Sequence, residues 1–440
     1  MIPLDTPTLA TLTFFISFFI LVLAGVPLAV SLGLCSVIIA STIITIDPYL
    51  LIKAFYQPFQ SFSLIAIYLF VAMGVIFSET GLTSLLIDLL YPVLGRKRYG
   101  LPFMVIIGSA IFGLLTGSAV ATAGAFAGLL GGEMIRKKFP KEHALAVVSV
   151  AAPLGALIPP SIPALVLSVS TNTSVLTNFA VVGGIGILYT IILLIWEAVV
   201  VTRRKIGEVY KEDSTRKDSY LKNILKAAPI ALVPIGVLGG IFMGLVSVSE
   251  AGAIGVIVSL LIAIAYRRLN LSTLRKIAIQ SASTTAVVYF LISTSYMVSY
   301  VWSMSKVYVV LDSMLQQISV ISVTLTLLVV EVILLIMGMF IDLIIFNITL
   351  APVLATILRP MGISPYLVNG IFALGNLIGT VTPPVGTVLA TACGALKIPL
   401  NSRIFKEVFF MLIPSIILYV LMVFIPDIAL WLPKLLGLRL

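Results

Sequence analysis

The sequence predicts an all-α polytopic membrane protein built from two inverted repeats. Of its 440 residues, 60% are hydrophobic and only 10% are charged, whereas a soluble domain carries about 25% charged residues. Apolar runs of roughly 18 residues or more, long enough to cross a bilayer as a helix, recur along the whole chain. Two similar devices also lie 224–225 residues apart: a glycine-broken apolar segment, then an apolar segment with a central Pro-Pro pair.

The first device contains GLLTGSA, which begins at Gly113, and LGALIPPS, which begins at Leu154. The second contains GMFIDLI, which begins at Gly338, and IGTVTPPVG, which begins at Ile378. Paired interruptions in corresponding halves of a membrane protein are the best sequence indication of a transport site near the midplane.

The basic residues predict the orientation of the chain. Of the 27 Lys and Arg residues, 22 lie in five clusters: 96–98, 136–141, 203–226, 267–276 and 397–406. Clusters between apolar runs are the positive-inside pattern, which argues against a nucleic-acid-binding surface. We therefore expect these clusters in the cytoplasm and both termini outside. Cys35 and Cys393 lie in apolar segments and predict neither a disulfide framework nor a metal site.

This orientation fixes about ten full spans. They cover residues 8–26, 28–46, 61–79, 144–170, 178–202, 227–246, 250–266, 283–303, 366–396 and 404–426. Short amphipathic segments near 82–94 and 271–282 are expected to lie at the interface. A polar cytoplasmic linker, 203–226, divides the first repeat, 1–202, from the second, 227–440.

Two more apolar segments do not fit as single spans. Residues 101–135 start and end at basic clusters on one side, so the segment must turn back near Gly113 and Gly117, where glycine gives backbone freedom. Residues 320–358 behave alike on the outer side, with the break near 338–342. Both are predicted to be re-entrant hairpins, since non-helical backbone at membrane depth must be buried or line a cavity. The first repeat begins with a span running inward and the second with one running outward, so the repeats are inverted.

The proline pairs, Pro159-Pro160 and Pro383-Pro384, interrupt the expected spans 144–170 and 366–396. Proline removes a backbone donor and clashes with the preceding turn, so each helix must open there. The freed carbonyls can bind a cation, and the N-terminus of the next helix favours an anion. A simple kink is the alternative for either pair alone, but the matching offsets favour a site.

The hairpin tips add polar groups. Tip one offers Thr116, Gly117 and Ser118, and tip two offers Gly338, Asp342 and Asn347. An intramembrane carboxylate such as Asp342 is a functional-site hypothesis by default, with a helix cap as the alternative. Ser118 could instead bond back to its own helix.

Four other ionisable residues lie in or beside apolar segments and are not assigned to the transport site. Glu250 is expected to cap an outer helix end, and Glu331 has no clear assignment. Glu197 is expected to snorkel toward the cytoplasm. His143, the only histidine, is expected to be an interfacial residue.

These motifs resemble the large membrane subunit, DctM type, of tripartite ATP-independent periplasmic (TRAP) transporters, over nearly the whole chain. The matching segments are AGVPLAVSLG (24–33), FSLIAIYLFVAMG (62–74), GLLTGSAVATAG (113–124), LGALIPPS (154–161), LGGIFMGLVSVSEAGAIG (238–255), GMFID (338–342) and TVTPPVG (380–386). Tyr68, Val248 and Leu343 each stand where the family commonly has proline.

The resemblance implies an elevator-type ion-transporter fold. Hairpins and broken helices would carry an organic anion, such as a C4-dicarboxylate or sialic acid, against a scaffold from regions 8–79 and 227–303. It also implies Na+ as the coupling ion, no organic cofactor, and a bacterial or archaeal cytoplasmic membrane. Two partners are implied: a small four-helix membrane subunit and a periplasmic substrate-binding protein. A stand-alone sodium–anion symporter of the same superfamily is the alternative.

The repeated spacing then predicts two sodium sites. The first uses Ser118, Gly155, Ile158 and Pro160, and the second uses Gly338, Asp342, Gly379, Thr382 and Pro384. Sodium needs only oxygen ligands, whereas a proton carrier needs a titrating group, and midplane acids are scarce. The substrate carboxylate is expected between the tips, where two helix N-termini converge, beside Thr116, Gly117, Ser118, Ser161, Gly386 and Thr387. No nucleophile–base arrangement, metal-binding pair or P-loop is present, which argues against an enzyme.

Overall fold

The computed structural model describes residues 5–83, 85, 90, 94, 97–207, 220–310, 313, 322–339, 347–348, 350–383 and 386–440. All regular secondary structure within these residues is helical. The predicted all-α class is therefore confirmed. The expected interfacial segment 82–94 and the linker 203–226 lie largely outside the described residues.

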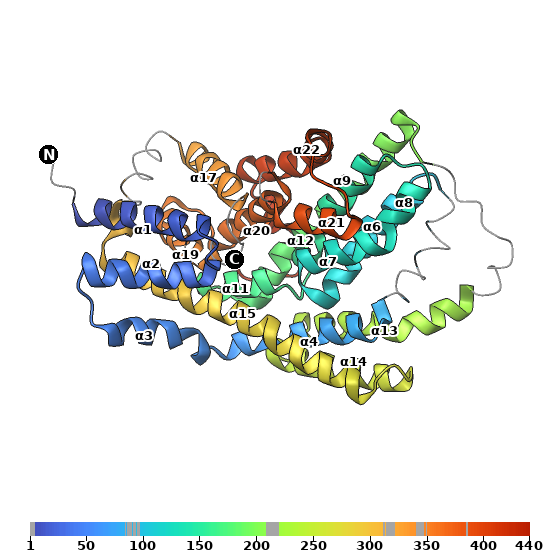
Figure 1. The fold of residues 1–440 in the computed structure, drawn as a ribbon, viewed down its shortest axis with the longest axis horizontal. Coiled ribbons are helices and arrows are strands. Elements are labelled where there is room, and N and C mark those ends of the chain that lie inside the picture. Colours follow the sequence, from blue (N-terminus) through green and yellow to red (C-terminus); the bar gives the residue numbers. More distant parts are fainter. Residues whose placement is uncertain are drawn as a thin grey trace.

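One group of helices contains the segments expected to form the scaffold. It comprises α1 (Thr6–Leu23), α2 (Leu28–Thr42), α3 (Pro48–Tyr56), α4 (Ile65–Glu79), α13 (Tyr220–Phe242), α14 (Val248–Ala265) and α15 (Leu271–Met304). α15 packs along α2, α3 and α4, and α14 packs against α4 and α13. In Figure 1, α15 is the long yellow helix that runs obliquely beside α2 and α4.

A second group contains the two hairpin devices and the helices around them. Its first half comprises α6 (Gly100–Thr116), α7 (Ala119–Phe126), a π-helical turn (Ala127–Gly131), α8 (Gly132–Arg136), α9 (Lys141–Ala151), α10 (Leu154–Leu157), α11 (Ile162–Ser170) and α12 (Val175–Arg204). Its second half comprises α17 (Val323–Gly338), α19 (Ala351–Leu358), α20 (Pro365–Val381), α21 (Thr387–Leu396), α22 (Ser402–Phe424) and α23 (Asp427–Leu435). α12 packs against α20, α22 and α23, and α9 packs against α22, so the two halves share one core.

Fewer helices qualify as membrane spans, judged by length and composition, than the ten expected. Among the described residues, six helices are long and apolar enough to cross a membrane: Thr6–Leu23, Phe62–Glu79, Val175–Arg204, Val248–Ala265, Leu271–Met304 and Ser402–Phe424. The pair Lys141–Leu157 and Ile162–Ser170, bent by 49°, makes a seventh if it is one span. Several other apolar helices are shorter, so the count of ten is not confirmed.

The separation of an interfacial helix, 271–282, from a span, 283–303, is wrong. α15 is continuous over 34 residues. The side chain of Asn270 accepts a hydrogen bond from the Thr273 amide at 2.8 Å, and no Gly or Pro interrupts the helix that follows. Without such a residue, nothing in the backbone ends the helix at the membrane surface.

Two helices were not predicted from the sequence. α3 starts at Pro48, after the Asp47 side chain accepts from the Tyr49 amide at 2.9 Å. α23 follows the last expected span after Pro426. Both are nine-residue helices next to a proline, a context that is also typical of turns.

His143 and Glu197 are buried together, which corrects their expected interfacial and snorkelling positions. His143 is 1% exposed and Glu197 is fully buried. The His143 Nε2 lies 2.9 Å from Glu197 Oε1, and its Nδ1 lies 2.9 Å from Glu407 Oε1. Ionised carboxylates only accept, so with both glutamates charged both ring nitrogens donate and His143 is an imidazolium cation. Arg204 also pairs with Glu407, and the four charges therefore sum to zero.

Candidate functional site

The first hairpin turns at the predicted tip. α6 ends at Thr116, and Gly117 has a φ of +58°, in the left-handed region that glycine adopts without strain. Ser118 is the N-cap of α7, since its Oγ accepts from the Ala121 amide at 3.3 Å. The turn and the serine predicted at it thus coincide with a helix N-terminus.

The first proline pair opens the crossing helix as expected. α10 ends at Leu157, and Ile158 is extended. Pro159 and Pro160 have no amide hydrogen, so the carbonyls of Gly155 and Ala156 lose the donors that a continuous helix would give them. The Gly155 carbonyl is thereby freed from helical bonding, as a cation site requires.

Ser161 closes the break locally. Its Oγ accepts from the Ala164 amide at 3.2 Å, which caps α11, and donates to the Ala156 carbonyl. Ser161 is fully buried. The single O–H of its hydroxyl is therefore donated within the protein, and its predicted role at the substrate stays a prediction.

Glycine pairs bring each hairpin against its crossing helix. A Cβ on Gly113 would lie 2.7 Å from the Gly155 Cα. In the second repeat, a Cβ on Gly379 would lie 2.7 Å from the Gly338 Cα. Both distances are too short for any side chain, so the two helices of each device cross backbone to backbone. The repeated spacing in the sequence therefore corresponds to a repeated contact in space.

Tip one also reaches the first break. A Cβ on Gly117 would lie 3.0 Å from the Pro160 carbonyl oxygen and 3.3 Å from the Ile162 amide nitrogen. The Ser118 carbonyl accepts from the Thr122 hydroxyl at 2.7 Å and faces the Gly155 position. The four residues of the first predicted sodium site thus lie on segments that meet at this tip.

The second device is described in part. α17 ends at Gly338, while Asp342 and Pro384 lie outside the described residues. The Thr382 hydroxyl donates to the Ile378 carbonyl at 2.7 Å. Gly386 begins α21 with a φ of +35° and no side-chain cap, and Thr387 is the first helical residue.

Two asparagines tie the second hairpin to both crossing helices. The Asn376 Nδ2 donates to Asn347 Oδ1 at 2.9 Å, and the Asn347 Nδ2 donates to the Pro163 carbonyl at 3.4 Å. Ser170 donates to the Asn347 carbonyl at 2.6 Å. Asn347 was predicted as a tip residue, whereas Asn376 was not singled out. Its signal was an amide in an apolar segment, seven residues before Pro383.

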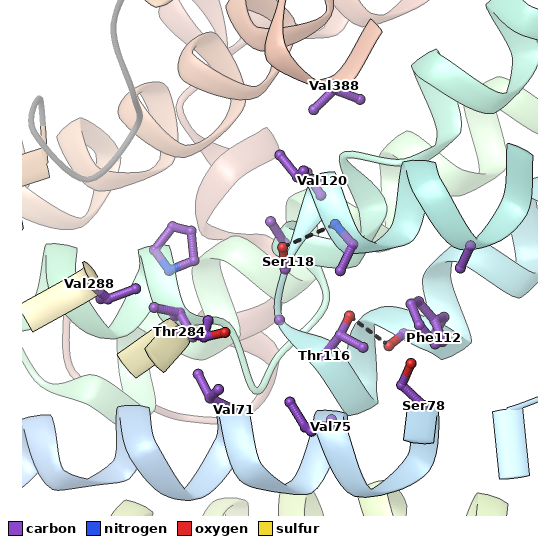
Figure 2. A pocket seen from close by; sticks show the side chains of 18 of the residues that line it. Val71, Val75, Ser78, Phe112, Thr116, Ser118, Val120, Thr284, Val288 and Val388 are labelled. Atoms are coloured by element: carbon purple, nitrogen blue, oxygen red, sulfur yellow. Dashed lines mark hydrogen bonds between the residues drawn. The ribbon is translucent and has the colours of Figure 1, made fainter. Parts of the chain in front are cut away.

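A cavity of about 450 Å³ lies where tip one meets the two breaks (Figure 2). Of the predicted substrate residues, Thr116, Gly117 and Thr387 line it, together with Ser118. Ser161 and Gly386 are not among its lining residues, although each is next to one that is.

Helices α4 and α15 form the opposite wall of this cavity. In Figure 2, Ser78, Val71 and Val75 of α4 and Thr284 of α15 lie across from the tip. Gln280 also lines the cavity. Sequence reasoning missed Gln280 because it placed residues 271–282 at the interface, and Thr284 lies in an expected span but was not singled out. The polar run from Gln280 to Thr285 was the available signal.

The electrostatic character of the cavity comes from the backbone. No charged side chain occurs among its described lining residues. The first residues of three helices line it: Ala119 of α7, Ile162 of α11 and Thr387 of α21. Helix N-termini carry partial positive charge and free amide hydrogens, which favour an anion.

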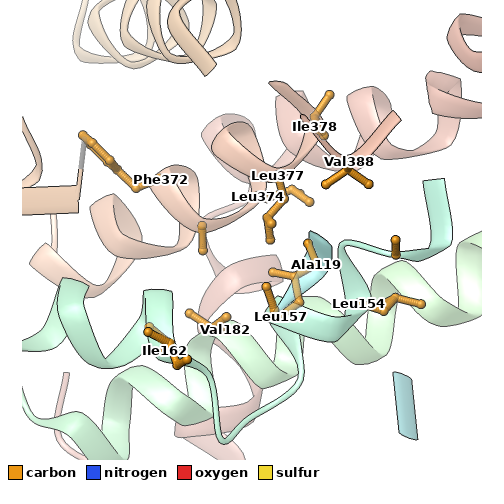
Figure 3. Packing of buried hydrophobic residues seen from close by; sticks show 14 of the residues in the cluster. Ala119, Leu154, Leu157, Ile162, Val182, Phe372, Leu374, Leu377, Ile378 and Val388 are labelled. Atoms are coloured by element: carbon orange, nitrogen blue, oxygen red, sulfur yellow. The ribbon is translucent and has the colours of Figure 1, made fainter. Parts of the chain in front are cut away.

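Apolar packing holds these helix ends in place (Figure 3). Ala119 and Leu157 of the first repeat lie opposite Leu374 and Leu377 of α20, and all four are buried. Burying side chains of this kind contributes about 1.5–3 kcal/mol for each large aliphatic residue. The two breaks are therefore fixed relative to each other by a common core.

Similarity to known proteins agrees with this arrangement. Residues 15–428 match the model of the family described as "Tripartite ATP-independent periplasmic transporter, DctM component". The 2,3-diketo-L-gulonate TRAP transporter large permease protein YiaN of Escherichia coli is 29% identical over 407 residues, covering 92% of this chain and 94% of that protein. The C4-dicarboxylate TRAP transporter large permease protein DctM of Pseudomonas aeruginosa is 30% identical over 414 residues, covering 92% and 94%.

A solved structure shows the same kind of fold. The YdaH transporter of Alcanivorax borkumensis superposes with a TM-score of 0.61 at 16% identity, and the match covers 87% of each chain. At this identity the likeness concerns the fold alone. The family match extends over nearly the whole sequence, and it includes both hairpin devices and both proline breaks. The chain therefore belongs to the DctM family, the large permease component of tripartite ATP-independent periplasmic transporters.

Proposed function

We propose that this chain carries an organic anion across the cytoplasmic membrane, coupled to sodium, by an elevator movement of the two hairpin devices against the scaffold. The observation that carries the proposal is the cavity at which three helix N-termini from both repeats meet. An anion there is stabilised by backbone amides without a buried Arg or Lys. The scaffold wall of α4 and α15 is the surface past which the cavity moves.

The substrate is a small carboxylate. The two relatives above are named for a C4-dicarboxylate and for 2,3-diketo-L-gulonate, and both of these compounds are organic anions. Thr116, Ser118 and Thr387 offer hydroxyls beside the helix N-termini. A charge-assisted hydrogen bond of this kind contributes about 1.5–3 kcal/mol. Gln280 and Thr284 line the same space from the scaffold and offer hydrogen-bonding groups to the far end of the anion.

Sodium binds at each glycine crossing, mostly through backbone oxygens. Ser118, Gly155, Ile158 and Pro160 form the first site. Gly338, Asp342, Gly379, Thr382 and Pro384 form the second. Proline at positions 159, 160, 383 and 384 supports the proposal, because it frees carbonyls that a continuous helix would use. In the described part of the chain, no group of His, Cys, Asp and Glu is placed to hold a metal ion.

The proposed function also needs partners. The family is tripartite, so a small membrane subunit binds the scaffold and a periplasmic protein delivers the substrate. The exposed apolar side chains of α1, among them Leu12, Ile16 and Ile20, suit a membrane-embedded partner.

Sodium coupling is tested by uptake into proteoliposomes that contain the chain with its two partner proteins. We expect uptake of a C4-dicarboxylate to require an inward sodium gradient and to stop when choline replaces sodium. Proteoliposomes that lack the partners serve as the control and are expected to show no uptake. Full uptake driven by a pH gradient without sodium would contradict the coupling, and full uptake by this chain alone would favour the stand-alone symporter.

The expected orientation is tested by cysteine labelling. Lys141 and Arg359 are both exposed, and each is replaced by cysteine in a variant that lacks Cys35 and Cys393. An impermeant thiol reagent added to intact cells is expected to label position 359 only, because the basic clusters that flank hairpin one face the cytoplasm. Labelling at position 141 instead would invert the topology and exchange the sides on which the two hairpins open.

A further inference from the structure

Glu331 is a buried acid that the proposed sites do not use. It lies on the stripe of α17 that contains Leu327, Leu334 and Gly338, and that stripe is buried. Glu331 is 2% exposed. Within the described part of the chain, neither of its carboxyl oxygens has a hydrogen-bond partner. The side chain therefore lies in the interior of the second hairpin device, and no group among the described residues compensates a negative charge on it.

The helices packed against α17 offer it no base. α17 packs against α20 and α22. In its second half α22 carries Tyr419, whose buried hydroxyl has no hydrogen-bond partner among the described residues. α20 contributes only Tyr366, near its first turn.

The charged residues of α22 are remote from this point. Arg403, Lys406 and Glu407 lie at the start of that helix, and Glu407 is already paired with His143 and Arg204. Glu407 precedes Tyr419 by 12 residues, which is roughly 18 Å along a helix at about 1.5 Å per residue. None of these groups can neutralise Glu331 across that distance in a core without water.

The equivalent position in the first repeat holds a buried apolar residue. Glu331 precedes Gly338 by seven residues, and Ile106 precedes Gly113 by seven. Ile106 is 1% exposed, so this register is buried and apolar in the first device. An ionised carboxylate buried without a partner is strongly unfavourable, and such a group takes a proton instead.

We infer that Glu331 is a proton-binding site whose carboxylate takes up one proton when α17 closes on α20 and α22. When the second hairpin lifts away, water reaches the carboxyl and the proton returns to solution. The proton adds to the carboxylate without any other bond being broken, and no redox partner is needed. The movement in this inference rests on the proposed function, whereas the presence of the proton in the closed arrangement does not.

The proton itself is tested by infrared spectroscopy of the purified full-length chain at neutral pH. We expect an absorption band of a protonated carboxylic acid that shifts in D2O and is lost in Glu331→Gln. Glu250→Gln is the matched control, because Glu250 is exposed and closes a capping box that Gln also supports. The control is expected to keep the band. A spectrum without this band, or a band that survives in Glu331→Gln, would overturn the inference.

The link to hairpin closure is tested by uptake with the partner proteins present and the sodium gradient held constant. Raising the external pH is expected to reduce uptake by the wild-type chain, by up to about tenfold per pH unit once the site is mostly deprotonated in the open hairpin. Glu331→Gln cannot lose a proton and is expected to give a flat profile. A wild-type profile as flat as that of Glu331→Gln would overturn the link, even if the infrared band is present. Failure of all uptake in every variant would concern the proposed function, and the infrared result would still decide the proton.

Discussion

In the first repeat, serine hydroxyls close both the hairpin tip and the helix break: Ser118 caps α7 and Ser161 caps α11. In the second repeat, Gly386 begins α21 without a side-chain cap. The crossings beneath these ends join equivalent glycines, Gly113 with Gly155 and Gly338 with Gly379. The glycine crossing thus sets the backbone plan of each device, while the capping of the helix ends differs between them.

The buried polar groups also differ between the two devices. The first carries Ile106 where the second carries Glu331. The second also contains Asn376, whose Oδ1 is buried and has no partner among the described residues. Unsatisfied buried polar atoms are costly, and they are retained where a ligand, proton or movement satisfies them during function. The described part of the second device therefore holds more buried polar atoms without a partner than that of the first, where Ser109 Oγ is such an atom.

The largest loss of stability is expected at Glu197, a buried carboxylate paired with a cation, and a much smaller one near Glu331. Glu197 is held by the His143 imidazolium at 2.9 Å. His143→Ala leaves Glu197 buried without a cation, which is expected to lower the free energy of unfolding by about 3–5 kcal/mol. Tyr419→Phe removes a buried hydroxyl of α22 that has no hydrogen-bond partner among the described residues, and is expected to lower the free energy of unfolding by less than about 1 kcal/mol. Unfolding of the purified variants in mixed detergent measures both values.

Lys434→Ala is the control for these charge deletions. Lys434 and Asp427 form an ion pair whose side chains are 49% and 70% exposed. An exposed pair of this kind contributes about 0–1 kcal/mol. If His143→Ala lowers the free energy of unfolding no more than Lys434→Ala does, the buried cluster of His143, Glu197 and Glu407 does not stabilise the core.

A second prediction concerns the glycine crossings. A Cβ on Gly113 would lie 2.7 Å from the Gly155 Cα and 2.8 Å from the Leu154 carbonyl oxygen, whereas a Cβ on Gly338 would lie 3.2 Å from the Gly379 Cα. Backbone atoms cannot rotate away, so Gly113→Ala is expected to lower the free energy of unfolding by about 1–3 kcal/mol. Gly338→Ala is expected to stay within about 1 kcal/mol of the wild type, since small shifts can relieve it.

Thermal unfolding of the two alanine variants under identical detergent conditions distinguishes them. Gly132→Ala is the control, because a Cβ on Gly132 meets no atom within 4 Å. Equal losses at Gly113 and Gly338 would show that the two crossings are equally tight, and would remove the asymmetry between the repeats.

Much of this architecture could be predicted from the sequence because it depends on backbone chemistry. Gly117 and the proline pairs act through φ freedom and missing amides, which are properties of the residue itself. The tip at Gly117, the breaks after Leu157 and Val381, and the capping box of Glu250 are therefore confirmed. The roles assigned to the sodium and substrate residues stay predictions.

Features that depend on tertiary contact could not be predicted. The burial of His143 requires Glu197 and Glu407, which are 54 and 264 residues away in the chain. Hydropathy alone placed it at the interface beside Lys141 and Glu142. The continuity of α15 was missed for a related reason, since its polar first turns resemble an interfacial helix when the packing of α15 against α4 is not known.

The smallest predicted effect concerns Ser161 and sharpens the comparison of the caps. Its hydroxyl accepts from the Ala164 amide and donates its single hydrogen to the Ala156 carbonyl, so Ser161→Ala is expected to lower the free energy of unfolding by about 0.5–2 kcal/mol. The apparent affinity for substrate is expected to stay unchanged. Ser118→Ala, at a cap that lines the cavity, is expected to weaken that affinity as well. Unfolding measurements and uptake at varied substrate concentration separate the two serines. A loss of affinity of about tenfold or more in Ser161→Ala, equivalent to about 1.4 kcal/mol, would place its hydroxyl on the anion after all and make the two caps of the first repeat equivalent.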